Sequence, residues 1–175
     1  GADGQSLGRG GRGGVGGVVG GASLMDERFP NFLAKRQTDF VWQPQAAADG
    51  LLYPELVNEI LRVCHRVHRE LGPGFFHQVY RRATMIELRR QGLDYDYIKR
   101  RPVEYQGQLL GHEDVRLILV EGRAVLATFA LRGVDDALVE RMKTDLVFLD
   151  ARLGLLANFH GPRLVVTPIR VGQDA

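Results

Sequence analysis

Regular hydrophobic periodicity begins only at Pro54, and this onset most constrains what the chain can fold into. Beyond it, apolar residues recur at three- and four-residue spacing, the pattern of one face of an amphipathic helix. That face comprises Val57, Ile60, Leu61, Cys64, Val67 and Leu71. Before it, half of the 22 glycines lie in the first 21 residues, a composition that cannot bury a core. We therefore predict one folded domain over residues 51–171, enough chain for a single core.

The pattern after the first helix predicts a sheet flanked by further helices. Gly72-Pro73-Gly74 ends the first helix, and a second follows from about Phe76 to Gln91 with Ile86 or Glu87 on its inner face. Branched and aromatic residues predict strands over residues 95–105, 115–120, 124–131, 154–159 and 164–171. Asp135 suits the N-cap of a third helix between the third and fourth of these strands. This order, ααβββαββ, predicts an α/β fold with a mixed central β-sheet flanked by helices.

The segment before the domain divides into two parts. Residues 1–22 are predicted to be a glycine-rich flexible tail, whose arginines and near absence of acids indicate either a short Arg-Gly nucleic-acid-binding tract or the remains of an organelle-targeting region. Residues 23–50 are predicted to be an extended aromatic arm. Its rings either dock on a partner or pack back on their own domain, and they belong to Phe29, Phe32, Phe40 and Trp42.

Composition narrows the class of protein. Cys64 is the only cysteine, which excludes an intrachain disulfide and a Cys-rich zinc site. No apolar stretch reaches the roughly 20 residues that span a bilayer, so we expect no transmembrane segment. Basic clusters suit phosphate or carboxylate partners, although solvated faces of helices and strands are the alternative. The candidate binding residues in these clusters are Arg81, Arg82, Arg89, Arg90, Lys99, Arg100 and Arg101.

The run from Val67 to Tyr80 contains Gly74, His77 and Tyr80 at three-residue spacing. It resembles the signature of the GxxExxY proteins, a branch of the PD-(D/E)XK nuclease-like superfamily, with His77 in place of the signature's Glu. Segments 87–93, 103–107 and 154–159 resemble later parts of the family in the same order. The resemblance covers residues 51–171 and implies a restriction-endonuclease-like core.

In active members of such a fold, an acid on one strand and an acid-x-lysine pair on the next hold a divalent metal and activate water. The resemblance places Leu117 at the first acid and Ala127 and Phe129 at the Glu and Lys. A test that does not depend on alignment agrees, because no lysine has an acid two residues before it. The three lysines are Lys35, Lys99 and Lys143, preceded at that spacing by Leu33, Tyr97 and Arg141. We therefore expect no catalytic residues, no metal and no cofactor.

Two further groups of residues could hold a metal ion, and each also has an ordinary structural interpretation. Glu113 and Asp114 could replace the lost metal ligands, but strand alternation turns Asp114 away from Leu117 and leaves Glu113 four residues off, unless the strand contains a bulge. With His112 they are interpreted as a solvated loop. A metal site from Cys64, His65, His68 and His77 is also conceivable. For His68, a helix-capping or packing role is more ordinary.

These observations predict a catalytically inactive nuclease-like domain that serves as a structural or interaction subunit of a larger assembly. Its partners are expected to be other protein subunits, and its location the mitochondrion or another organelle interior. The alternative is a non-cleaving module that binds RNA or DNA through its Arg clusters. A third hypothesis is an active metal-dependent nuclease with displaced residues.

Overall fold

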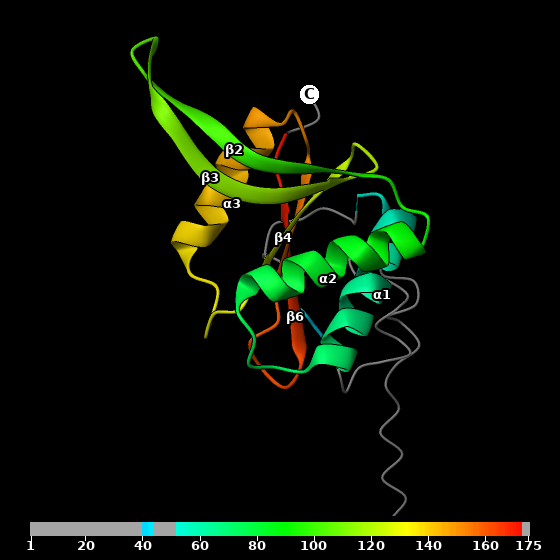
Figure 1. Cartoon of the computed structure of the whole chain (residues 1–175). Coiled ribbons are helices and arrows are strands. Elements are labelled where there is room, and N and C mark those ends of the chain that lie inside the picture. Colours follow the sequence, from blue (N-terminus) through cyan, green and yellow to red (C-terminus); the bar gives the residue numbers. More distant parts are fainter. Residues whose placement is uncertain (1–39, 44–51, 173–175) are drawn as a thin grey trace, which may run out of the picture.

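A computed structural model describes residues 40–43 and 52–172, which are organised around one six-stranded mixed sheet. The strand order is β1-β6-β5-β4-β3-β2 (Figure 1). Along the chain the elements are β1 (Phe40–Trp42), α1 (Pro54–Leu71), α2 (His77–Arg90), β2 (Tyr95–Tyr105), β3 (Gln108–Val120), β4 (Ala124–Phe129), α3 (Asp136–Phe148), β5 (Leu153–Asn158) and β6 (Leu164–Arg170). The predicted α/β class and the order ααβββαββ are confirmed, with one additional strand, β1, before them.

Helices cover both faces of the sheet. One apolar core joins α1 and α2 to the sheet, and a second joins α3 to the opposite face. Asp135 caps α3 as predicted, because its Oδ1 accepts a hydrogen bond of 2.9 Å from the Leu138 amide. On α2, Glu87 is the buried member of the predicted alternatives, whereas Ile86 is exposed. Within the described residues no helix is both long and apolar enough to cross a membrane.

The turn between α1 and α2 is built by the residues that carry the family resemblance. Gly74 has φ +110°, a backbone conformation that other residues rarely adopt. The Tyr80 hydroxyl donates a hydrogen bond of 2.6 Å to the Gly72 carbonyl and accepts one of 3.2 Å from the Phe75 amide. The Tyr80 ring is fully buried and stacks on Phe159 at 4.6 Å. The Gly and Tyr of this motif therefore hold α2 in place against the sheet.

The segment predicted as an extended arm contributes a strand to the fold. β1 pairs in parallel with β6, with Phe40 opposite Leu164 and Trp42 opposite Val166. Trp42 is only 8% exposed and belongs to the core under α1 and α2. Of the two alternatives for the arm, Trp42 follows the one in which the ring packs on its own domain. Phe29 and Phe32, and the tail over residues 1–22, lie outside the described residues.

β2 and β3 form a long hairpin that projects beyond the body of the molecule (Figure 1). β3 pairs with β4 only through residues 118–120, so the outer part of the hairpin is a two-stranded ribbon. The register shifts between Ile98 and Arg100, opposite Leu117 and Asp114, and Arg116 there has φ +53°. β3 thus contains a bulge, the irregularity on which the expected orientation of Asp114 depended.

Candidate functional site

A pocket of about 210 Å³ lies where α2 and α3 approach β3 and β4. All four positions at which the family resemblance places altered catalytic residues line it, namely His77, Leu117, Ala127 and Phe129. The other lining residues are Arg81, Val115, Arg116, Thr128, Leu138, Arg141, Met142, Asp145 and Leu156. The fold therefore brings together four family positions of which the outermost, His77 and Phe129, are 52 positions apart in the sequence.

Strand alternation explains how β4 supplies two of these residues. Ala127 and Phe129 are two apart, so both face α3 and pack against the core that contains Leu117. In an active member the same spacing would place a carboxylate and an ammonium beside a metal ion. Here it places a methyl group and a phenyl ring there. The wall of the pocket formed by the sheet is consequently apolar.

The polar groups of the pocket are mostly cationic. Arg81 and His77 come from the first turns of α2, Arg116 from the β3 bulge and Arg141 from α3. The pKa of His77 is lowered, first by desolvation and then by the positive charges of Arg81 and Arg116. Its Nε2 lies 3.4 Å from Arg116 Nη1. Burial and the two neighbouring cations thus both disfavour the protonated form of His77.

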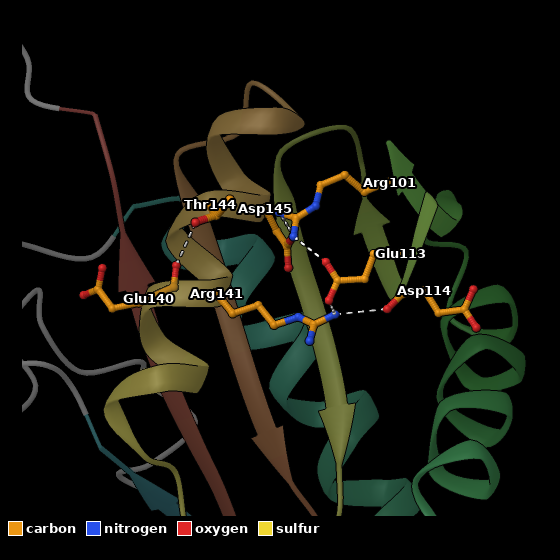
Figure 2. Close-up of polar contacts among 7 residues, drawn as sticks. All are labelled: Arg101, Glu113, Asp114, Glu140, Arg141, Thr144 and Asp145. Carbon is orange, nitrogen blue, oxygen red and sulfur yellow. Dashed lines mark hydrogen bonds and ion pairs between the residues drawn. The ribbon is translucent and has the colours of Figure 1, made fainter. Parts of the chain in front are cut away.

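A chain of ion pairs joins α3 to the hairpin beside the pocket (Figure 2). Arg101 Nη1 lies 2.7 Å from Asp145 Oδ1, and its Nη2 lies 3.0 Å from Glu113. Arg141 continues the chain with a contact of 2.7 Å to Glu113 and a hydrogen bond of 3.1 Å to the Asp114 carbonyl. The Arg101–Asp145 contact does not have hydrogen-bond angles, so it is an electrostatic contact. These interactions fix the base of the ribbon to α3.

Asp145 is the one carboxylate that lines the pocket. Desolvation raises its pKa, Arg101 and Arg141 partly oppose the shift, and Glu113 adds to it. Sequence analysis did not single out Asp145, Arg116, Arg141 or Thr128. For Asp145 a signal existed, since it lies three residues after Met142 on the apolar face of α3, where an acid needs a partner. Arg116 offered none, because its direction depends on the bulge.

Glu113 and Asp114 do not line the pocket. Their interpretation as part of a solvated loop is wrong, because both lie within β3 and both are held by arginines. The Asp114 carboxylate contacts Arg100 at 3.4 Å and Arg116 at 3.3 Å. Because of these arginine contacts and the bulge, both acids have a structural role in the hairpin.

The predicted basic clusters separate into different environments. Arg81 and Arg101 are mostly shielded from solvent, since Arg81 is 7% exposed in the pocket wall and the side chain of Arg101 is 13% exposed between two acids. Arg89 donates a hydrogen bond of 2.8 Å to the Tyr95 hydroxyl at the surface. The remaining members of the predicted set are exposed, namely Arg82, Arg90, Lys99 and Arg100.

The histidines and the cysteine of α1 have packing roles. His68 Nε2 lies 2.9 Å from the Gly161 carbonyl, and its ring contacts Phe159 at 6.0 Å. Cys64 is fully buried, and burial raises the pKa of its thiol to about 12. Across residues 40–43 and 52–172, no three His, Cys, Asp or Glu side chains are grouped as a metal site would require.

The pocket also does not fit the divalent cation that the nuclease fold implies. Mg²⁺ and Ca²⁺ need several oxygen ligands. Asp145 is the one carboxylate in the wall, it is engaged by Arg101, and the other charged groups of the wall are positive. A metal ion there would face cation repulsion and an apolar strand surface.

Of the comparisons with known proteins, the one with protein families finds a match. A search of curated proteins finds no match, and a search of solved structures finds none either. A family model described as the PD-(D/E)XK nuclease superfamily matches residues 54–171. That match runs from the first residue of α1 to the residue after β6, and includes every residue that lines the pocket. The chain therefore belongs to the PD-(D/E)XK nuclease superfamily.

Proposed function

We propose that this domain does not cleave nucleic acid and serves as an interaction subunit of a larger protein assembly. The observation that carries the proposal is the composition of the pocket, where Leu117, Ala127 and Phe129 occupy the positions of the expected metal-site residues. We further infer a place among the GxxExxY proteins, whose signature the Gly74 and Tyr80 spacing resembles. Glycine and arginine in the first 21 residues favour an organelle as its location.

The outer part of the β2–β3 hairpin is the surface we propose for a protein partner. Its exposed apolar side chains are Val103, Tyr105, Leu109 and Leu110, the last two 58% and 67% exposed. A two-stranded ribbon is marginally stable on its own in water, and apolar residues at its end gain most from burial against another protein. The ion pairs at its base hold it in a fixed direction.

Native capture tests this surface. The tagged full chain, expressed in its source cells, is isolated at low salt and its complexes are weighed by native mass spectrometry. We expect L109S/L110S to lose the bound subunits. V147S is the matched control, since Val147 on α3 is 73% exposed and equally apolar. A wild-type chain recovered only as a free monomer, or equal loss in both variants, would contradict the proposal.

A metal titration tests the pocket itself. Wild-type chain is titrated with Mn²⁺ and free ion is followed by electron paramagnetic resonance. We expect no stoichiometric binding that depends on pocket residues. The variant L117D/A127E places two carboxylates in the wall and is the positive control for ion capture. One Mn²⁺ bound by the wild type and released by D145N would overturn the proposal.

Binding of nucleic acid without cleavage is the second candidate. It is favoured by the exposed basic residues Arg82, Arg90 and Lys99, none of which has a carboxylate partner within the described part of the chain. Such binding would weaken steeply with salt, because each phosphate contact releases counterions. Fluorescence anisotropy with duplex DNA and RNA at two salt concentrations distinguishes it from protein association. Retention of the partner complex by R82Q/R90Q, with loss of duplex affinity, would assign the two functions to separate surfaces.

A further inference from the structure

Among the charged residues that line the pocket, Arg81 differs from the others in having no ion-pair partner within the described part of the chain. Arg141 is paired with Glu113, Arg116 with Asp114 and Asp145 with Arg101. Arg81 has no carboxylate partner among the residues that the structure describes. Its described contact is with the Tyr97 ring, whose centroid lies 5.7 Å from the guanidinium carbon.

Arg81 is also 93% buried, since only 7% of its surface is exposed. An arginine with so little exposed surface and no anion beside it is unusual, because proteins ordinarily pair such a group. Arg81 lines the pocket, so the side from which a compensating charge can approach is the pocket itself. The pocket wall therefore contains one guanidinium, that of Arg81, with no carboxylate partner among the described residues.

The rest of the wall limits the anion. Much of the wall is an apolar surface. A fully hydrated ion in the pocket would leave that surface in contact with water, which is unfavourable. The apolar residues are Leu117, Phe129, Leu138, Met142 and Leu156. Thr128, which is 8% exposed, also lines the pocket, and its buried hydroxyl has no hydrogen-bond partner. His77, which also lines the pocket, adds ring nitrogens that can form hydrogen bonds.

We propose that this pocket binds a single carboxylate attached to an apolar group, with Arg81 pairing with the carboxylate and the strand wall receiving the apolar group. The proposal rests on the proposed function, because a catalytic metal would occupy the same space. One free guanidinium matches one negative charge and offers a bidentate donor pair. A phosphate monoester carries more charge and needs more donors. A phosphodiester is extended by polar groups on both sides of the phosphate, and an apolar wall does not suit them.

Such a carboxylate could be a small organic acid or the C-terminal end of a partner chain. The recognition chemistry is the same in both cases. The ligand probe is N-acetyl-phenylalanine, and its matched control is N-acetyl-phenylalanine amide, which differs only in the charge. An N-acetylated pentapeptide that ends in Phe, with a free or an amidated C-terminus, represents the protein source.

Binding to the full chain is measured by isothermal titration calorimetry, with NMR amide shifts to locate the site. We expect the acid to bind at least about tenfold more tightly than the amide. We expect the variant R81Q to lose this preference, and R82Q, which changes the exposed neighbour, to retain it. A free-ended peptide that binds more tightly than the acid would assign the source to a chain end, and equal affinities would assign it to a small acid.

Equal binding of acid and amide to the wild-type chain would overturn the inference without reliance on any variant. So would a preference unchanged in folded R81Q, or stronger binding of inorganic phosphate or a short oligonucleotide than of the acid. These results differ from failure of the proposed function, which would appear as metal-dependent cleavage. Absence of cleavage together with absence of acid binding would remove the inference alone.

Discussion

At the scale of single residues, the pocket of this superfamily domain is marked by apolar side chains on β3 and β4. Leu117, Ala127 and Phe129 are aligned by strand geometry that could equally align metal ligands. Glu113 and Asp114, which precede Leu117 on β3, are engaged by arginines. The chemistry of the site therefore depends on residue type, and less on the path of the chain.

The ionisation of His77 should respond to its cationic neighbours. Desolvation, Arg81 and Arg116 all lower the pKa of this imidazole. Removal of one cation in R116Q is expected to raise the pKa toward its ordinary value, as followed by the Cε1–H signal in an NMR titration. The variant R82Q, which changes an exposed side chain outside the pocket, serves as the control. An unchanged or lower pKa in R116Q would contradict this electrostatic description.

Asp145 should make stability depend on pH. Desolvation raises the pKa of its carboxyl group, so the folded chain holds that proton more tightly than the unfolded chain. The resulting stabilisation is complete below the carboxyl group's ordinary pKa and is lost as pH rises through the raised pKa. Urea unfolding of wild type and D145N at several acidic pH values measures this contribution. We expect the wild-type advantage in unfolding free energy to fall as pH rises over this window, and an increase would contradict it.

At the scale of elements, the helices and most strands could be predicted from periodicity and turn residues. The bounds of β2 agree with the prediction, because aromatic and branched residues recur from Tyr95 to Tyr105 and a turn at Gly107 follows. β1 was missed, because three residues are too few to show a period. The bulge at Arg116 was unpredictable for a different reason, since it depends on register between two strands. The composition of the pocket could be predicted only where the family resemblance named positions.

Close packing of α3 on the sheet depends on a glycine in β5. A Cβ at Gly154 would lie 2.6 Å from Met142 Sδ and 2.8 Å from its Cγ. Met142 is buried in the core between α3 and the sheet, so its side chain would have to shift out of that packing. G154A is expected to lower the free energy of unfolding by about 1–3 kcal/mol. G133A is the control, because a Cβ there meets nothing within 4 Å. Equal stability of the two variants in urea melts would contradict this account of the packing.

The role of β1 can be measured through the chain's single tryptophan. Trp42 lies in the core, and its loss in W42A should leave a cavity that costs about 3 kcal/mol. The control Q43A changes an exposed side chain, while the hydrogen bond from the Gln43 amide to the Val166 carbonyl is a backbone contact. It should change the free energy of unfolding by less than about 0.5 kcal/mol. Circular dichroism in urea measures both. Solvent-exposed tryptophan fluorescence in the native chain would show that β1 is not docked.

At the scale of the whole molecule, two surfaces are distinct, namely the pocket and the outer part of the β2–β3 hairpin. The body is a nuclease-superfamily frame with helices on both faces of its sheet, and the hairpin leaves that body as a ribbon with an apolar end (Figure 1). The network of Figure 2 links them, since Arg101 and Glu113 on the ribbon contact Asp145 and Arg141 beside the pocket. A ligand that changes the charge of the pocket would therefore act close to the base of the β2–β3 hairpin, whose outer part is the proposed partner surface.

The most direct test of the central claim is a cleavage assay on the purified full chain. Supercoiled plasmid, linear duplex, single-stranded DNA and RNA are incubated with Mg²⁺ or Mn²⁺ at a molar excess of protein. We predict no cleavage above that of a preparation of the variant F129K/L117D/A127E tested without metal. Metal-dependent cleavage by the wild type that is abolished by E113Q or D114N would contradict the account, because it would place a working metal site among residues here assigned to the hairpin's ion pairs.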